Sequence, residues 1–396
     1  MHIVDVNEFY SPTGGGVRTY VDRKMAIIAR MGHRLTVIAP GREDKIEEKE
    51  GGRVHYVRTR AMPFDRNYGL FWQAEPIDQL LDRLDPDVIE NCSPWRPAWI
   101  VGRRRGRGRA VTSFFFHNDN MEAYAKRVLA PIASPALIER RFAWYDRYIA
   151  RMLGGFDTVV TNGPALAKRL RARGTRVDAT MTLGIERGVF SPAHRDEGLR
   201  AALLAQLGLP PGGRLLVALG RHHPEKRWSV VIEAVARAAA RGPVGLMLMG
   251  RGMQTPALLR LVAGHPHIRL FEPVYDRPRL SRILASADAF IHGNDAEPFG
   301  LVVSEALAAG LPLVVPDVGG AFEVAGPAYA EAYSAGDAGA AAAAIERLFA
   351  RDRAGLRAAA AVAAGRVRSD EDHAAALVAH YATTIARRQA DTAVSR

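Results

Sequence analysis

Two glutamates, Glu297 and Glu305, are the side chains whose type and spacing first suggest chemistry, because they stand eight residues apart around a turn and a helix start. A carboxylate accepts hydrogen bonds from neighbouring hydroxyl groups, as a sugar or a ribose presents them. The plainer alternative is that Glu297 only compensates a helix dipole and that Glu305 is a solvated helix residue.

The flanking pattern predicts a strand, a helix and a second strand of a parallel sheet. We expect a short buried strand over 287–292, a helix over 299–309 with Pro298 in its first turn, and a second strand from Leu313. Glu297 would then lie at the carboxyl edge of the sheet, where open α/β sheets bind ligands. Backbone N–H groups at the helix start would be unpaired and would favour an anion. These groups belong to Phe299, Gly300, Leu301 and Val302.

A ligand that carries both hydroxyl groups and phosphate would satisfy the two carboxylates and the free N–H groups together, and a nucleotide sugar is such a ligand. Upstream, Gly220, Arg221 and Lys226 follow a predicted strand over 214–219. Cations at the carboxyl end of a strand suit a diphosphate, although a solvated charge run is the alternative. No third ligand stands at metal spacing beside the two histidines of this run, so a zinc site is not expected.

The first half offers two further candidates. A glycine turn at 14–16 precedes a helix over 17–31, and glycines allow a sugar or phosphate to approach the backbone closely. His117 follows a predicted strand over 110–116, again at a carboxyl end where substrates bind. Alternatively, His117 has only a structural role and caps the next helix.

These motifs together resemble the retaining GT-B glycosyltransferases of family 4. The resemblance spans nearly the whole chain in the expected order. It rests on Gly14-Gly15-Gly16, Gly220-Arg221, Pro224-Glu225-Lys226, Glu297-Pro298-Phe299-Gly300-Leu301, Glu305, Ala309-Gly310-Leu311-Pro312 and Gly319-Gly320.

The resemblance implies an α/β chain with two Rossmann-like, doubly wound domains that face each other across a cleft. We expect an acceptor-binding domain over 1–186, a nucleotide-sugar-binding domain over 187–368, and a last helix over 369–396 that crosses back to the first domain. The alternation of strands and helices in both halves agrees with such a fold.

The resemblance also implies roles for the site residues. Gly15 and Gly16 would face the donor, and His117 would contact the donor sugar near its reacting carbon. Val274 would border the nucleobase with its backbone. Arg221 and Lys226 would hold the leaving diphosphate, Glu297 would orient the sugar hydroxyls, and Glu305 would bind the ribose.

No metal and no cofactor are expected beyond the nucleotide sugar, which is a co-substrate. Asp85-Pro86-Asp87 looks like a metal-binding pair of acids, but it precedes a strand, and we interpret it as a turn. The transfer would then be independent of a metal ion and would retain the anomeric configuration.

Composition favours a cytoplasmic protein. The chain has 396 residues, a single cysteine, Cys92, and no apolar run of the ~20 residues that span a bilayer. The formal charge is +12, and most of the excess falls in residues 1–190, which suggests an acidic partner for that half.

Arginines at 103–109 and at 140–151 could form a cationic surface for anionic lipid headgroups at the inner face of the cytoplasmic membrane. The apolar stripe that shares the second stretch is also typical of a core-facing helix. Nucleic acid is not the expected partner, because aromatic residues are not interleaved with the basic run.

The predicted function is therefore transfer of a hexose from GDP-mannose or a UDP-hexose to a hydroxyl group of a lipid or lipid-linked saccharide, in glycolipid or cell-envelope glycan synthesis. The alternatives are a sugar-nucleotide epimerase-like enzyme and a catalytically silent nucleotide-sugar-binding protein.

Overall fold

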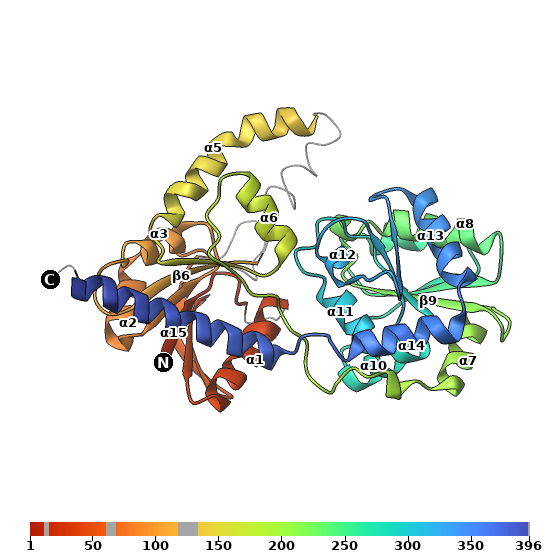
Figure 1. Cartoon of the computed structure of the whole chain (residues 1–396), viewed down its shortest axis with the longest axis horizontal. Coiled ribbons are helices and arrows are strands. Elements are labelled where there is room, and N and C mark those ends of the chain that lie inside the picture. The colour runs from red at the N-terminus through yellow and green to blue at the C-terminus, as the bar shows by residue number, and fades with distance from the viewer. Residues whose placement is uncertain (12–15, 61–68, 118–133, 395–396) are drawn as a thin grey trace. The chain divides into compact units, whose positions relative to one another are not determined.

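The computed structural model describes residues 1–11, 16–60, 69–117 and 134–394, and the chain forms two compact units. Unit 1 contains Met1–Thr182 and Asp370–Arg396, and unit 2 contains Leu183–Ser369 (Figure 1). The first boundary lies four residues before the one expected from the sequence, and the second lies one residue after it.

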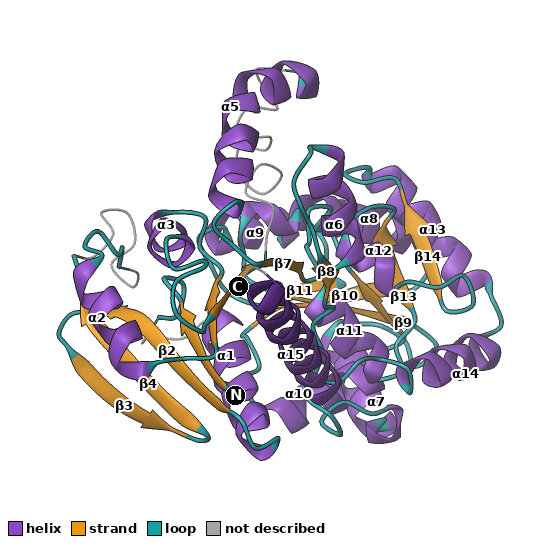
Figure 2. Ribbon diagram, turned by 60° about the vertical axis from the view of Figure 1, so that its left-hand side comes forward, coloured by secondary structure: helices purple, strands orange, loops and turns teal. Residues whose placement is uncertain are grey.

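Unit 1 is built on a sheet that has eight strands in its described residues, in the order β3-β4-β2-β1-β5-β6-β7-β8 (Figure 2). All neighbours pair in parallel except β3 and β4, which form an antiparallel edge. The strands are β1 His2–Val6, β2 Arg34–Gly41, β3 Lys45–Lys49, β4 Gly52–Arg58, β5 Val88–Asn91, β6 Val111–Phe116, β7 Thr158–Thr161 and β8 Ala179–Thr180.

Helices cover this sheet, and the last of them comes from the far end of the chain. They are α1 Gly16–Arg30, α2 Glu75–Leu84, α3 Arg96–Gly102, α5 Pro135–Leu153, α6 Pro164–Ala172 and α15 Asp370–Val394. In Figure 1, α15 runs beside α1, and the two helices are in contact. Among the described helices, none combines the length and apolar character that a bilayer span requires.

Unit 2 contains a parallel sheet of six described strands in the order β11-β10-β9-β12-β13-β14. The strands are β9 Arg214–Leu219, β10 Val244–Met249, β11 Ile268–Phe271, β12 Ala289–Ile291, β13 Leu313–Pro316 and β14 Ala330–Tyr333. The helices are α7 Glu197–Gln206, α8 Trp228–Ala239, α9 Thr255–Val262, α10 Arg277–Ser286, α11 Leu301–Ala308, α12 Gly320–Val324, α13 Ala338–Ala350 and α14 Arg353–Ala364, with short 3₁₀ turns at Pro192–His194 and Pro224–Lys226.

Buried apolar strands form the parallel part of both sheets, which helices cover on both faces. Every residue of β1, β6 and β10 is buried, as expected for strands with helices on either side. Numbered along unit 2, the strand order is 3-2-1-4-5-6, which is the order of dinucleotide-binding folds. The order reverses between β9 and β12, so the carboxyl ends of these two strands form the switch point at which such sheets bind ligands.

The structure corrects the expected start of one helix. The helix expected over 299–309 begins at Leu301, so Pro298 and Phe299 lie outside it, because Gly300 adopts a left-handed conformation with φ 83°. The sequence analysis did not predict β3, a charged edge strand, or β14, which lies in an alanine-rich stretch. Gly14 and Gly15 of the expected glycine turn lie outside the described residues.

Candidate functional site

The loops that follow β9 and β12 bring Lys226 and Glu297 into contact. The Nζ atom of Lys226 lies 2.7 Å from Oε2 of Glu297, and the two side chains are only 13% and 17% exposed. The residues are 71 positions apart in the chain. They meet because β9 and β12 are neighbours at the switch point of the sheet.

Two more side chains from the β12 loop surround the same carboxylate. The amide Nδ2 of Asn294 donates to Oε2 of Glu297 at 2.9 Å, and Nε2 of the buried His292 lies 3.4 Å from that oxygen. Burial alone would raise the pKa of Glu297, but the Lys226 charge and His292 outweigh it and hold the pKa well below its usual range. Glu297 is therefore ionised at any ordinary pH.

Close packing of the backbone makes this arrangement depend on Gly293. A Cβ atom at this position would come within 2.6 Å of the Lys226 carbonyl oxygen and within 2.8 Å of Val231. Because Gly293 has no side chain, the loop after β12 can lie against the loop after β9. Arg227 and Asp295 strengthen the contact between the loops with an ion pair of 2.5 Å.

The start of α11 presents backbone donors next to this cluster. The helix begins after Gly300, and the N–H group of Gly320 fixes the preceding loop by donating to the Glu297 carbonyl at 2.7 Å. Among described residues, no acceptor takes the N–H groups of the four residues Phe299 to Val302. The predicted set of free donors is therefore present, although only Leu301 and Val302 belong to the helix itself. Such donors favour an anion.

Glu305 belongs to a different ion pair from Glu297. It lies in the second turn of α11, and its Oε1 accepts a hydrogen bond from Nη2 of Arg277 at 2.7 Å. The Glu305 side chain is 9% exposed, so it is not the solvated helix residue of the plainer alternative. Arg277 in turn lies over the ring of Phe190.

Arg221 does not join the Lys226 cluster. Its side chain is 75% exposed and pairs with Glu225 at 3.1 Å, while its carbonyl oxygen accepts from the indole of Trp228 at 3.0 Å. Val274 follows β11 and packs against the core of unit 2. Of the two donor-facing glycines expected in the first half, Gly16 opens α1 and Gly15 lies outside the described residues.

His117 lies directly after β6 in unit 1, at the carboxyl end of that strand. Its ring stacks on Phe115 with centroids 4.5 Å apart and meets the edge of Tyr20 at 5.5 Å. Burial and the nearby charge of Lys24 lower the pKa of His117 to about 3. The imidazole is therefore neutral near pH 7 and can exchange hydrogen bonds but not serve as a charged acid.

A buried charge cluster lies close to His117 and was not predicted from the sequence. Lys24 of α1 and Tyr381 of α15 both contact Glu90 of β5, and the Lys24 and Glu90 side chains are 1% and 2% exposed. The hydroxyl of Tyr20 lies 2.8 Å from Nε2 of His373, whose Nδ1 lies 3.0 Å from a backbone carbonyl. Helix α15 is thus tied to the core of unit 1 by polar contacts.

The two acids at 85 and 87 form the expected turn and are occupied by a side chain. Asp85 caps α2 in a left-handed conformation, and Arg109 pairs with Asp85 at 3.0 Å and with Asp87 at 2.6 Å. Asp87 also accepts from the backbone of His2. Both carboxylates therefore have partners within the protein.

Most of the arginines at 103–109 also have carboxylate partners. Arg103 and Arg104 pair with Asp78, and Arg105 pairs with Asp157. With Arg109, four of the five arginines at 103–109 are offset by carboxylates. The arginines of α5, at 140, 141, 147 and 151, are all exposed.

Sequence reasoning also missed His292, Asn294 and Arg277 as members of the site. His292 and Asn294 follow β12 at the switch point, so their position after a predicted strand was an available signal. Arg277 gave no such signal, because its contact with Glu305 arises only when α10 and α11 pack in the folded unit.

Two models of known protein families together match most of the chain. A model described as Glycosyltransferase Family 4 matches residues 14–182, and one described as Glycosyl transferases group 1 matches residues 213–351. A GDP-mannose-dependent alpha-(1-6)-phosphatidylinositol dimannoside mannosyltransferase of Mycobacterium tuberculosis is 30% identical over 317 residues, 80% of this chain and 79% of that protein. A GDP-mannose-dependent alpha-mannosyltransferase of the same species is 28% identical over 324 residues, 81% and 80% of the two chains.

Solved structures resemble the chain along its length. A sucrose-phosphate synthase from Thermosynechococcus elongatus has a TM-score of 0.73 at 19% identity, covering 98% of this chain and all of that one. The Anabaena protein HepE in complex with UDP has a TM-score of 0.68 at 17% identity and covers both chains fully. These likenesses show the fold, and with the two parallel sheets they confirm the predicted fold class.

Proposed function

Since this chain belongs to glycosyltransferase family 4 and is a glycosyltransferase, we propose that it transfers mannose from GDP-mannose to a hydroxyl group of a lipid or lipid-linked saccharide. The donor is chosen because two relatives of 28–30% identity are GDP-mannose-dependent, and one of them acts on a phosphatidylinositol dimannoside. The observation that supports donor binding in unit 2 is the Lys226–Glu297 contact beside the free N–H groups of residues 299–302.

The donor would occupy the switch point of unit 2. Its diphosphate would accept hydrogen bonds from the N–H groups at the start of α11 and from Lys226, which would exchange Glu297 for phosphate oxygens. Glu297, ionised and held by Asn294, would accept from hydroxyl groups of the sugar. Glu305, held in place by Arg277, would accept from the ribose.

In the transfer, the bond between the sugar and the diphosphate breaks, and negative charge grows on the departing oxygen. One preorganised donor at such a charge typically lowers the barrier by ~3–4 kcal/mol, so Lys226 and the N–H groups would supply most of the stabilisation. We propose retention of configuration: the diphosphate leaves and the acceptor attacks on the same face, with the diphosphate accepting the proton. Arg221, exposed and paired with Glu225, would have to turn to reach the diphosphate.

His117 would contribute from unit 1 as a neutral hydrogen-bonding group near the reacting carbon. With its pKa lowered to about 3, it would not protonate the leaving group. Unit 1 would bind the acceptor. Metal independence is also part of the proposal, since Asp85 and Asp87 both pair with Arg109.

Peripheral contact with an anionic membrane in the cytoplasm would bring the enzyme to a lipid acceptor. Helix α5 extends away from the sheet of unit 1 (Figure 2) and carries exposed arginines around an indole, Trp144, that is 57% exposed. Arginine and tryptophan on one exposed helix suit an interface with anionic headgroups. The loop arginines at 103–109 would contribute little, because most of them already have carboxylate partners.

A donor panel tests the proposal. The melting temperature of the protein would be measured with GDP-mannose, UDP-glucose and ADP-glucose, since a ligand at 100 times its dissociation constant stabilises by ~2.7 kcal/mol. We expect the largest shift with GDP-mannose, followed by release of GDP and transfer to a phosphatidylinositol mannoside acceptor. Release of free mannose isomers without an acceptor would indicate an epimerase-like enzyme, and binding without any turnover would indicate a silent binding protein.

A further inference from the structure

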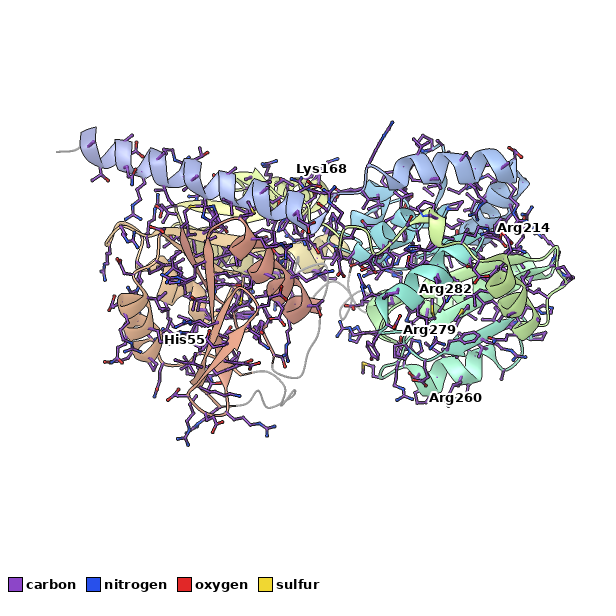
Figure 3. All side chains as sticks on the ribbon, turned by 90° about the horizontal axis from the view of Figure 1, so that it is seen from below. His55, Lys168, Arg214, Arg260, Arg279 and Arg282 are labelled. Carbon is purple, nitrogen blue, oxygen red and sulfur yellow. The ribbon has the colours of Figure 1, made fainter. Side chains whose placement is uncertain are left out.

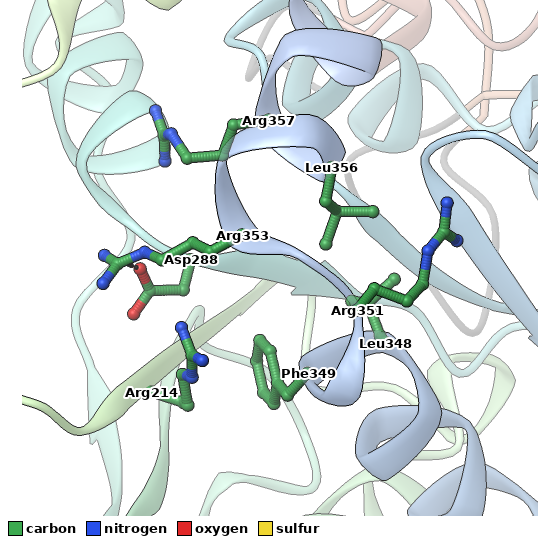
Figure 4. A pocket seen from close by; sticks show the side chains of 8 residues that line it. All are labelled: Arg214, Asp288, Leu348, Phe349, Arg351, Arg353, Leu356 and Arg357. Atoms are coloured by element: carbon green, nitrogen blue, oxygen red, sulfur yellow. Dashed lines mark hydrogen bonds and ion pairs between the residues drawn. The ribbon is translucent and has the colours of Figure 1, made fainter.

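Unit 2 has a basic pocket at the edge of its sheet opposite the proposed donor site. The hollow is shallow and open, with about 270 Å³ of free space when the solvent at its mouth is counted, and Figure 4 shows its side chains. The lining residues are Arg214, Asp288, Leu348, Phe349, Arg351, Arg353, Leu356 and Arg357. Four of these eight residues are arginines and one is an acid, so the lining carries a net positive charge.

The pocket lies at the amino ends of the strands. Arg214 is the first residue of β9, and Asp288 directly precedes β12, while Lys226 and Glu297 follow the carboxyl ends of the same two strands. Six residues of β9 separate the edges, about 20 Å of strand at ~3.3 Å per residue. A ligand in the pocket would therefore be separate from the donor.

The one carboxylate of the pocket is already fully engaged. Oδ2 of Asp288 accepts from Arg200 at 2.8 Å and from the backbone of Leu215 at 2.8 Å, and Oδ1 accepts from Arg200 at 3.1 Å and from Arg353 at 2.8 Å. Four donors occupy its lone pairs. Asp288 thus accepts from Arg200 and Arg353 and has no lone pair left for a hydrogen bond from the other arginines of the lining.

Arg214 and Arg357 are the two arginines of the lining that have no carboxylate in contact among the described residues. In the part of the chain that the structure describes, neither contacts a carboxylate: Arg214 lies over the ring of Phe349 at 5.4 Å, and Arg357 reaches only the carbonyl of Ala287, at 3.4 Å. Both are half-buried. Burial and the repulsion from Arg195 lower the pKa of Arg357, and they outweigh the nearby negative charges of Asp288 and Glu197.

We propose that this pocket is a second, anion-binding site, in which the guanidinium groups of Arg214 and Arg357 turn toward a phosphate group at the open mouth. Guanidinium groups offer paired N–H donors that match phosphate oxygens, and half-buried arginines bind them better than exposed ones. The aliphatic and aromatic walls formed by Leu356 and Phe349 would exclude water around the phosphate. A bound phosphate would connect the start of α14 to the amino end of β9.

Titration with inorganic pyrophosphate tests the site, with GDP present throughout to occupy the proposed donor site. The test variant is Arg214→Gln/Arg357→Gln, and the control Arg260→Gln/Arg269→Gln removes the same charge from exposed arginines of α9 and β11. Figure 3 labels Arg214 and Arg260, which lie on different parts of unit 2. We expect the test variant to bind pyrophosphate at least ~10-fold more weakly than wild type, and the control to match wild type within ~2-fold.

A second arm identifies the source of the phosphate. Vesicles of phosphatidylcholine with phosphatidylglycerol are sedimented with wild type, with the test variant and with pyrophosphate as competitor. Because α5 would keep part of the protein on the vesicles in both cases, the site is assigned to a lipid headgroup if pyrophosphate lowers the retention of wild type to the level of the test variant. Pyrophosphate binding without such a decrease in retention assigns it to a soluble phosphate. Equal pyrophosphate binding by wild type and the test variant, or no binding at all, overturns the site; circular dichroism verifies that the variants are folded.

Discussion

The Nζ atom of Lys226 lies 2.7 Å from Oε2 of Glu297, and this contact joins the loops after the two strands at which the sheet order of unit 2 reverses. In the absence of a donor, the lysine neutralises the glutamate. A diphosphate competes for the same ammonium group, so the contact keeps Lys226 positioned before the donor binds.

Replacing Lys226 should therefore affect turnover more than donor binding. We expect Lys226→Ala to lower kcat at least ~100-fold while the donor dissociation constant changes by less, since the missing charge acts mainly as the diphosphate departs. Lys168→Ala, which removes an exposed lysine of α6, is the matched control and should keep the wild-type kcat. Near-normal turnover in Lys226→Ala would refute the leaving-group role.

Turnover should persist in excess chelator. Lys226 and the N–H groups at the start of α11 are proposed to stabilise the departing diphosphate, so removal of divalent ions should change the initial rate by less than ~2-fold, against the ~10²-fold or more that loss of such stabilisation costs. Initial rates with and without EDTA give the answer. A rate that collapses and is restored by Mg²⁺ or Mn²⁺ would contradict metal independence.

Breaking the buried pair of unit 1 should loosen α15. Lys24→Met leaves Glu90 charged and buried, which typically costs ~3–5 kcal/mol, whereas Lys24→Met/Glu90→Gln removes both charges and should recover most of the loss. Hydrogen exchange of peptides from α15 provides a local measurement, because Tyr381 of that helix contacts Glu90. Equal protection in wild type and Lys24→Met would show that the pair does not hold the helix.

The pH dependence of unit 1 should reflect two opposing groups. Burial and Lys24 lower the pKa of His373 to about 3, so between about 3 and 6.5 only the unfolded chain is protonated there, and this contribution to stability is lost as the pH falls through 6.5. Burial and Glu90 raise the pKa of Asp5 to about 7, so between about 3.8 and 7 the folded chain holds the proton, and stability is lost as the pH rises through this window.

Melting curves at pH 7 and pH 5 can separate these two groups. His373→Gln should lose less stability than wild type over this interval, and Asp5→Asn should lose more, by up to ~1.4 kcal/mol per pH unit for each proton. Identical pH profiles for all three proteins would mean that neither group is as perturbed as its surroundings suggest.

Arginines of α5 should govern binding to anionic liposomes. Arg140→Gln/Arg147→Gln removes two exposed charges, and we expect several-fold less co-sedimentation at low salt, at ~1 kcal/mol per basic residue near the surface. The control Arg103→Gln/Arg109→Gln removes the same charge from arginines that pair with Asp78, Asp85 and Asp87. Equal loss in both variants would point to net charge rather than to this helix.

Much of the fold could be predicted because buried parallel strands have continuous apolar sequences. The bounds of β9 agree with the strand expected over 214–219, and β6 differs by one residue from the strand expected over 110–116. The edge strand β3 could not be found this way, since its residues KIEEK are mostly charged and exposed. The start of α11 was misplaced because Pro298 suggested a first turn, whereas the left-handed conformation of Gly300 decides where the helix begins.

Of the site, the sequence predicted residues that follow strands but not the partners that other elements supply. Lys226 and Glu297 were both recognised from their motifs, and their contact depends on the strand order of the folded sheet. The cluster of Lys24, Glu90 and Tyr381 joins three segments far apart in the chain, and only tertiary packing brings them together.

Helix α15 belongs to unit 1, yet the ribosome makes it after all of unit 2. The contact between Tyr381 and Glu90 can therefore form only when nearly the whole polypeptide has been synthesised. During translation, the second lobe can acquire its native form while the first still lacks its closing segment, so nascent chains should expose the α1 surface until synthesis is almost finished.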